Sequence, residues 1–280
     1  MLELSSLIPD QETLTPSWQW QSWQGLPYLT CSLLKDWQHG FFSQHFSPRL
    51  PEDLVKILHP KAQAYRVKQV HGNRVLMPSE IEVTINVENS TTSLSPGDGI
   101  LSEGVKEAVW VATADCTPVL MVDVKTGRVA AIHAGWRGTA QRIVPEAIAR
   151  FVSFGSCLEN LRIAMGPAIT GEVYQVSEEV AAQVGSSLNL KEQTDTSEGI
   201  IEALQEVPNS PLSPDPQPGR VRLDVRRVNE LQLQQLGISE KQVAIAPHCT
   251  YQQPEHFFSY RRTRQKKVQW SGIVSNLPSN

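Results

Sequence analysis

The sequence predicts an α/β protein, and the stretch 109–138 carries most of that prediction. Three apolar runs, at 109–113, 118–124 and 128–132, are separated by turn residues and have the length of buried strands. A cysteine follows the first run and a histidine follows the third, and a glycine-punctuated turn then leads into a helical pattern. Reactive residues at strand ends, just before a helix, are typical of α/β proteins.

The expected elements before this stretch are short, and each is identified by its own periodicity or turn residues. In chain order they are a strand around 18–20 with one packed face, a short helix over 52–58, a strand over 64–70, a polar loop over 84–92, and a turn into a buried strand over 97–102.

Helices and strands alternate after it. Apolar residues recur at helical spacing from Ile143 to Val152, and we expect this helix to start at Thr139 and stop at Gly155. Pro145 then falls in its second turn. The remaining elements are a strand over 161–165, a helix starting at Ser177, a helix capped by Asp224 and ended by Gly237, and a strand over 243–246.

The stretch 185–220 interrupts this order. It is rich in Ser, Asn and Thr and has five prolines between Pro208 and Pro218. Such composition is typical of a mobile surface insertion. We therefore expect a single domain over residues 1–280 that carries this insertion.

Composition limits the partners. The chain has 280 residues, enough for a sizeable core, with 40% hydrophobic and 19% charged residues. A net charge of −4 argues against nucleic acid as the main partner, and the basic cluster 261–267 is interpreted as a solvated face. No apolar run has the length of a membrane helix, and no signal peptide is evident, so we expect a cytoplasmic protein without a membrane partner. The four cysteines are expected to be thiols or ligands.

His71, Cys116 and His133 all follow predicted strands, and strands of one sheet end near one another. Two imidazoles and a thiolate suit Zn²⁺, with a fourth position left for water or substrate. Two alternatives stay open from the residues alone. One is a buried structural thiol beside two hydrogen-bonded histidines, and the other is a Cys116–His133 nucleophilic pair with Asp115 orienting the imidazole. The metal requires His71, whereas the nucleophilic pair does not.

The segment after His133 is a candidate anion site. Gly135 and Gly138 would let a ligand approach the backbone at a helix start, where free N–H groups attract anions. Arg137 lies between them and would fork onto a phosphate or carboxylate. The plainer alternative is a helix entry with a surface arginine.

Several motifs then resemble one family. KQVHGNRV, DGILS, ATADCTPVLMVD, AAIHAGWRG, MGPAITGEVYQVSEEV and CTYQQPEHFFSYRR occur in order between about residues 64 and 262. Together they resemble the laccase-domain family, whose members are also called polyphenol oxidoreductase-like proteins, purine nucleoside phosphorylases or peptidoglycan editing factors. The resemblance implies a four-layer α-β-β-α sandwich with mixed sheets. It also implies that His71, Cys116 and His133 are zinc ligands, and copper is a second metal that suits this set.

The resemblance further implies zinc-dependent phosphorolysis of adenosine, inosine and related nucleosides, with adenosine deamination as a further activity. The implied partners are a purine nucleoside and phosphate. As hypotheses, Arg137 and the N–H groups near Gly135 and Gly138 would hold phosphate, and Asp115 would carry a proton for the purine nitrogen. His248 and Tyr260 would contact the ribose.

Other activities remain open. They are a cysteine or zinc amidase acting on peptidoglycan precursors, a copper-dependent polyphenol oxidase, and a degenerate metal-binding member without catalysis. A four-copper oxidase needs many histidines in HxH pairs, and this chain has seven histidines with none so paired.

Two segments depart from the family pattern. Gln44 stands where an arginine is expected, and TRQKKVQ follows Arg262 in place of a Thr-Gly-Arg turn. If these segments contact the substrate, specificity is altered or activity is low.

Overall fold

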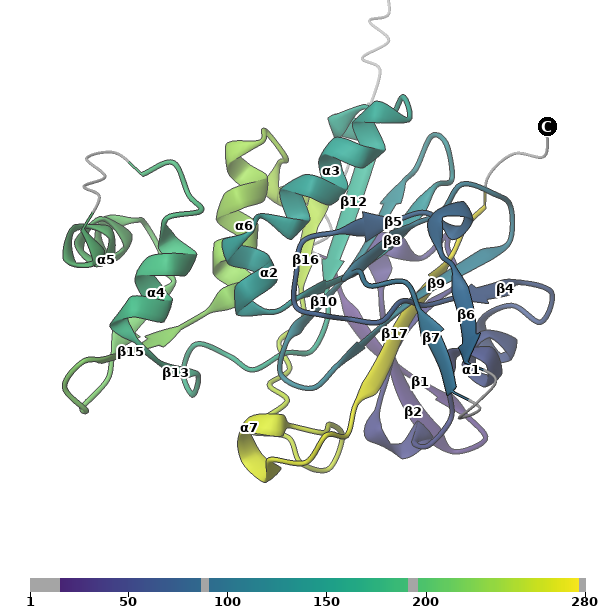
Figure 1. Ribbon diagram of the computed structural model, residues 1–280, viewed down its shortest axis with the longest axis horizontal. Coiled ribbons are helices and arrows are strands. Elements are labelled where there is room, and N and C mark those ends of the chain that lie inside the picture. The colour runs from purple at the N-terminus through teal and green to yellow at the C-terminus, as the bar shows by residue number, and fades with distance from the viewer. Residues whose placement is uncertain (1–15, 87–90, 191–195, 277–280) are drawn as a thin grey trace, which may run out of the picture.

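Two six-stranded mixed sheets pack face to face and form the centre of the molecule (Figure 1). The computed structural model describes residues 16–86, 91–190 and 196–276. The first sheet has the order β1 (Trp18–Trp23), β2 (Leu26–Cys31), β3 (His39–Phe42), β17 (Gln269–Val274), β9 (Glu107–Thr113) and β4 (Gln63–Tyr65). The second has the order β16 (Val243–Ile245), β12 (Leu161–Met165), β10 (Thr117–Asp123), β11 (Val129–Ala134), β8 (Gly99–Leu101) and β5 (Val75–Leu76).

Strand β10 shows why the predicted apolar runs are continuous. All seven of its residues are buried, because successive side chains point to opposite faces and both faces are covered. Leu120 and Val122 join the core between the two sheets. Val119 and Met121 join the core between the second sheet and its helices.

Helices cover the outer face of each sheet. On the second sheet, α3 (Ile143–Ser153) and α6 (Val225–Gln235) pack onto the core that contains Val119 and Met121. On the first sheet, α1 (Pro51–Leu58) packs through Leu54 against Trp110. The layers therefore run helix, sheet, sheet, helix, and the expected mixed α/β sandwich is confirmed.

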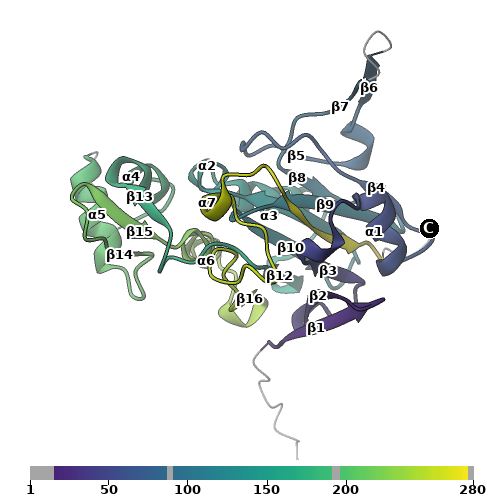
Figure 2. The same ribbon diagram turned by 90° about the horizontal axis from the view of Figure 1, so that it is seen from below.

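A smaller lobe lies beside the second sheet (Figures 1 and 2). It has its own apolar cluster and consists of β13 (Gln175–Ser177), α4 (Glu178–Gly185), α5 (Ser197–Glu206), β14 (Leu212–Pro214) and β15 (Arg220–Leu223). The stretch 185–220 therefore contains a helix and a strand, and Leu204 and Leu212 are buried in the lobe's cluster. The mobility of that stretch stays a prediction, and residues 191–195 lie outside the described part.

Several predicted helix boundaries are confirmed. Ser177 caps α4 by accepting a hydrogen bond from the N–H of Val180. Asp224 caps α6 by accepting bonds from the next helical N–H groups, and Gly237 follows that helix with φ 88°. Gly155 likewise follows α3 with φ 86°, as an αL glycine beyond a helix end should.

The helix expected from Thr139 is wrong in its start. It is two helices, α2 (Trp136–Ala140) and α3, and Arg142 lies between them in the left-handed region with φ 61°. Pro145 falls in the first turn of α3, where its missing N–H would have no partner inside the helix. The chain therefore restarts a helix two residues before this proline.

Two other predictions need correction. The strand expected over 64–70 is reduced to β4, and beyond it Lys68 makes a single bridge to Pro96. The loop expected over 84–92 is largely a hairpin of β6 (Val83–Asn86) and β7 (Thr91–Leu94), with 87–90 outside the described residues. This ribbon stands out from the body (Figure 2), and Val83 at its start is 58% exposed, so the hairpin is not packed on the core of the two sheets.

The last helix, α7 (Tyr260–Thr263), is a single turn before β17. Among the described residues, no helix has the length and apolar character needed to cross a bilayer.

Candidate metal centre

His71, Cys116 and His133 converge. One ligand atom from each lies within 4.8 Å of the other two. The reason differs from the expected one, because the three residues do not follow strands of a single sheet. His71 comes after β4 of the first sheet, Cys116 lies where the chain passes from β9 to β10, and His133 is in β11 of the second sheet. Stacking of the two sheets brings them together.

Asp98 positions two of the three candidate ligands, and together the four residues His71, Cys116, His133 and Asp98 form what we call the metal corner. No role for Asp98 was predicted from the sequence. Its carboxylate is fully buried and accepts hydrogen bonds from the backbone N–H groups of Val70, His71 and Gly72 at 3.1, 2.9 and 2.8 Å. It also pairs with Nδ1 of His133 at 2.8 Å. Asp98 therefore holds both histidines, and it leaves Nε2 of His133 for a ligand.

The backbone at His71 needs this support. His71 has φ 62°, in the left-handed region that residues other than glycine rarely adopt. The three N–H bonds to Asp98 bracket it and compensate for that conformation. A buried acidic residue directly before a short strand was the available signal, since a buried carboxylate needs several partners.

Neighbouring charged groups change the pKa of the Cys116 thiol. Burial alone raises the pKa of Cys116, but the positive charge and hydrogen bond of His133, together with those of His71, outweigh burial and lower it to about 6. For His133, burial alone lowers the pKa, and the Cys116 thiolate and Asp98 raise it to about 9. In the metal-free protein the two groups therefore form a thiolate–imidazolium pair at neutral pH, and a thiolate is the form that ligates metals.

Two predicted ligand-binding glycines are needed for packing in this corner. A Cβ on Gly135 would lie 2.8 Å from Sγ of Cys116, and a Cβ on Gly138 would lie 2.9 Å from the carbonyl oxygen of Gly72. Both distances are shorter than real Cβ contacts, so any side chain would force the His71 loop or the thiol to move. Contact of these glycines with a substrate stays a prediction.

The donor set fits a divalent transition metal. Two imidazoles and one low-pKa thiol converge, a buried carboxylate orients one imidazole, and a glycine keeps the space beside the sulfur free. Zn²⁺ takes such ligands, and copper does too.

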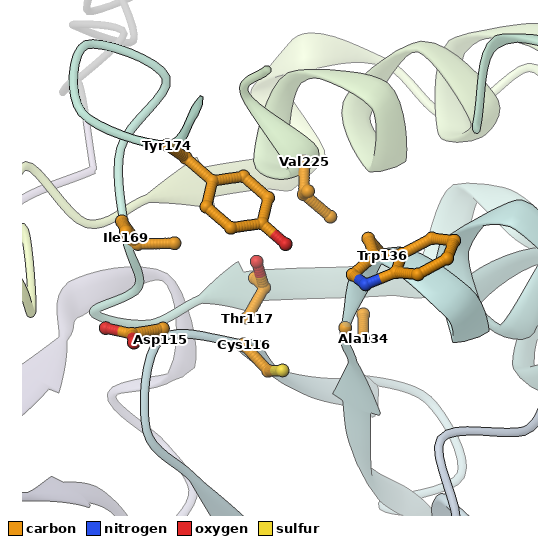
Figure 3. Close-up of a pocket in the computed structure, with 9 residues that line it drawn as sticks. Asp115, Cys116, Thr117, Ala134, Trp136, Ile169, Tyr174 and Val225 are labelled. Atoms are coloured by element: carbon orange, nitrogen blue, oxygen red, sulfur yellow. The ribbon is translucent and has the colours of Figure 1, made fainter. Parts of the chain in front are cut away.

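A small cavity of about 30 Å³ lies against the thiol (Figure 3). The β9–β10 turn and strands β10 and β11 of the second sheet supply its floor, with Tyr174 and Trp136 as the aromatic walls. Its lining residues are Asp115, Cys116, Thr117, Ala134, Gly135, Trp136, Ile169, Tyr174 and Val225. Six of these were not predicted from the sequence, because only their position in space marks them: Thr117, Ala134, Trp136, Ile169, Tyr174 and Val225.

Tyr174 is held firmly in this wall. The guanidinium of Arg261 lies 4.8 Å from the centre of its ring and donates a hydrogen bond to the carbonyl of Gln175 at 2.8 Å. Burial, with the nearby Cys116 thiolate, raises the pKa of Tyr174 to about 12, so the phenol is neutral at physiological pH.

Asp115 lines the cavity but is engaged elsewhere. Its carboxylate accepts hydrogen bonds from Oγ1 of Thr250 at 2.8 Å and from the backbone N–H of Arg261 at 2.7 Å. In Figure 3 the carboxylate points away from the thiol of Cys116. These contacts fasten the start of α7 to the β9–β10 turn, and the proton-carrier role of Asp115 stays a prediction.

The three remaining candidate residues, Arg137, His248 and Tyr260, lie outside the cavity lining. Arg137 is exposed and its guanidinium lies 4.4 Å from the centre of the Trp136 ring, beside the cavity. His248 bonds to Gln253 at 2.9 Å, Tyr260 is 46% exposed, and neither lines the cavity. The role of Arg137 in phosphate binding, and the ribose contacts of His248 and Tyr260, stay predictions.

The fold and this corner define a mixed α/β protein with a candidate metal centre. Residues 52–275 match the family described as multi-copper polyphenol oxidoreductase laccase, and the chain belongs to that family. It is 54% identical over 258 residues to a protein of Synechocystis sp. named purine nucleoside phosphorylase, a match that spans 92% of this chain and 97% of the relative.

Two more distant likenesses agree with this assignment. The chain is 28% identical over 196 residues to a protein named adenosine deaminase from an unknown prokaryotic organism, spanning 70% of this chain and 68% of the relative. The solved structure of YlmD from Geobacillus stearothermophilus superposes with a TM-score of 0.71 at 21% identity and covers 92% of this chain and 99% of that one. The latter likeness shows the fold.

Proposed function

We propose that this chain is a purine nucleoside phosphorylase that holds a divalent metal, best matched by Zn²⁺, on His71, Cys116 and His133. The observation that carries the proposal is the convergence of these three ligand atoms within 4.8 Å, beside a cavity. The 54% identity to a protein named for this activity supplies the reaction.

The reaction exchanges two bonds at the anomeric carbon. The bond from C1′ to the purine nitrogen breaks, a bond from C1′ to a phosphate oxygen forms, and the departing nitrogen takes a proton. Zn²⁺, when bound, supplies Lewis-acid polarisation of a group presented to it. Arg137 is an exposed cation beside the cavity and would bind the phosphate dianion. The apolar walls of Ala134, Ile169 and Val225 would exclude water, so that phosphate reaches C1′ in preference to hydrolysis.

Three further activities have one supporting observation each. Adenosine deamination is supported by the relative named adenosine deaminase. A nucleophilic amidase is supported by the lowered pKa of Cys116 next to His133. Polyphenol oxidation is supported by the description of the family. Within the described residues, however, one group of three metal-ligating side chains converges, and such a group suits one ion and not several coppers. The location in the cytoplasm stays a prediction.

The test is turnover measured together with metal content. Purified protein is incubated with inosine and phosphate, and hypoxanthine and ribose 1-phosphate are separated by chromatography, with metal quantified by mass spectrometry. We expect both products, with loss of product and of metal in Cys116→Ala. The matched control is Cys157→Ala, an exposed free thiol far along the chain, which should keep both. Metal-loaded protein that forms neither product would refute the proposed activity, and Cys116→Ala with full metal content would refute the metal centre.

A further inference from the structure

Two hydroxyl groups face each other across the cavity. In Figure 3, Oη of Tyr174 and Oγ1 of Thr117 point toward one another above the thiol of Cys116. The side chain of Thr117 is buried, with 1% of the residue exposed. Among the residues that the structure describes, no hydrogen bond involves either hydroxyl, and neither oxygen belongs to the fully enclosed polar atoms that lack a partner, so both are open to the cavity. Hydroxyls that open into a cavity and make no bond within the protein are free to bind a polar group of a ligand.

The two hydroxyls are held at fixed positions. Thr117 is the first residue of β10 and pairs with Ala134 of β11, so its backbone belongs to the second sheet. Tyr174 comes from the lobe, and its backbone carbonyl accepts a hydrogen bond from Leu223 at 3.0 Å while Arg261 covers its ring. A ligand group that bonds to both hydroxyls therefore bridges the body and the lobe.

The chemistry of the pair selects one part of a nucleoside. Both hydroxyls are uncharged and each can donate and accept, which matches the hydroxyls of a sugar. A phosphate dianion only accepts, and the nearby cations that suit it, Arg137 and Arg261, stack on the rings of Trp136 and Tyr174 and do not line the cavity. A cavity of about 30 Å³ admits a hydroxyl-sized group and not a purine ring.

We propose that the hydroxyls of Tyr174 and Thr117 form the ribose-binding subsite of this enzyme and set a preference for ribonucleosides over 2′-deoxyribonucleosides. This inference rests on the proposed function for its substrate, a purine nucleoside. It assigns the sugar contacts to residues other than His248 and Tyr260, which lie outside the cavity lining. Losing one neutral hydrogen bond should cost about 3- to 10-fold in kcat/KM for the ribonucleoside.

The test compares inosine with 2′-deoxyinosine in three variants. Tyr174→Phe and Thr117→Val remove one hydroxyl each and keep nearly the same shape, and Tyr251→Phe removes an exposed hydroxyl elsewhere. We expect the inosine-to-deoxyinosine ratio of kcat/KM to fall by about 3- to 10-fold in the first two variants and to stay at the wild-type value in the third. The KM for phosphate should not change. An equal loss for both nucleosides, or a raised KM for phosphate, would overturn the assignment.

Calorimetric binding of the same two nucleosides without phosphate separates this inference from the proposed function. If wild-type protein binds inosine more tightly than 2′-deoxyinosine but forms no product, the phosphorylase assignment fails. The subsite then stands if Tyr174→Phe removes the difference in affinity. If the wild-type protein binds neither nucleoside, the subsite is refuted as well.

Discussion

Two clusters of histidines in this molecule have different chemistry. The metal corner consists of His71, His133, Cys116 and Asp98. The aromatic cluster consists of His45, His248 and His256 around Trp20, whose ring centre is 4.5 Å from that of His256.

The difference lies in what surrounds each imidazole. In the metal corner a buried carboxylate and a thiolate raise the pKa of His133 to about 9 against the effect of burial. In the aromatic cluster burial, together with the neighbouring His256, lowers the pKa of His248. An imidazole beside anions is oriented to bind a cation, whereas an imidazole among rings serves packing. The neighbours, and not the histidines themselves, therefore decide the function of each cluster.

The sharpest way to break this comparison is to remove one histidine from each cluster. His71→Ala should abolish metal binding and phosphorolysis, because two ligands rarely retain a catalytic metal. His256→Ala should keep the metal content of the wild type. Mass spectrometry of the purified proteins checks both, and loss of metal in both variants would contradict the distinction.

Asp98→Asn tests the carboxylate that only the metal corner has. An amide keeps the shape but loses the charge that orients His133. We expect metal affinity to fall about 10- to 100-fold, as for other changes of a ligand's hydrogen-bond partner. Competition with a chromophoric chelator measures it, and unchanged affinity would show that His133 needs no anion.

Gly135→Ala tests the space beside the sulfur. The added Cβ would lie 2.8 Å from Sγ of Cys116, so the thiol must shift. We expect a loss of roughly 1–3 kcal/mol in the free energy of unfolding, as in other overpacked cores. Denaturant titration of the metal-free protein measures this loss. A variant as stable as wild type would mean that the Cys116 thiol can shift away from the added Cβ at no cost in stability.

The pH dependence of thiol reactivity distinguishes Cys116 from the exposed Cys157. The Cys116 pKa of about 6 places its thiolate at full population by neutral pH. Because this pKa is below that of Cys116 in the unfolded chain, the stability it contributes is present at high pH and is lost as pH falls through about 6. In metal-free protein, alkylation of Cys116 should therefore reach its plateau by about pH 7. An alkylation rate that still rises tenfold per pH unit between 7 and 8 would contradict the ion pair.

The smallest effect is expected in the aromatic cluster. Trp20 is 37% exposed, so Trp20→Phe removes a partly buried ring and should cost about 1 kcal/mol of stability or less. Metal content and kcat/KM should match the wild type. A large loss of activity would place this cluster in the site.

The sequence predicted the strands of the second sheet well because those strands are covered on both faces. Their apolar runs are unbroken, as in β10, and turn residues separate them. The hairpin of β6 and β7 and the last strand, β17, were missed for opposite reasons. The hairpin has no core to face, and β17 is interrupted by Gly272, where a Cβ would lie 2.4 Å from the ring of Trp110. A strand that accommodates a large neighbour loses its own apolar pattern.

Only those site residues could be predicted from the sequence whose side-chain chemistry by itself suggests a functional role. A thiol and two imidazoles after predicted strands made His71, Cys116 and His133 candidates for metal binding, with two alternatives left open, and the family resemblance then favoured the metal. Asp98, Thr117 and Tyr174 are common residue types, and their roles follow from where the stacked sheets and the lobe place them. Long-range placement of this kind has no local signature in the sequence.

The central claim is that one metal ion binds to a thiolate and two imidazoles in the metal corner. X-ray absorption spectroscopy at the zinc edge of the purified protein tests this claim most directly. We predict one sulfur neighbour at about 2.3 Å and imidazole nitrogens at about 2.0–2.1 Å, with the sulfur absent in Cys116→Ala. A wild-type spectrum with only oxygen and nitrogen neighbours would contradict it.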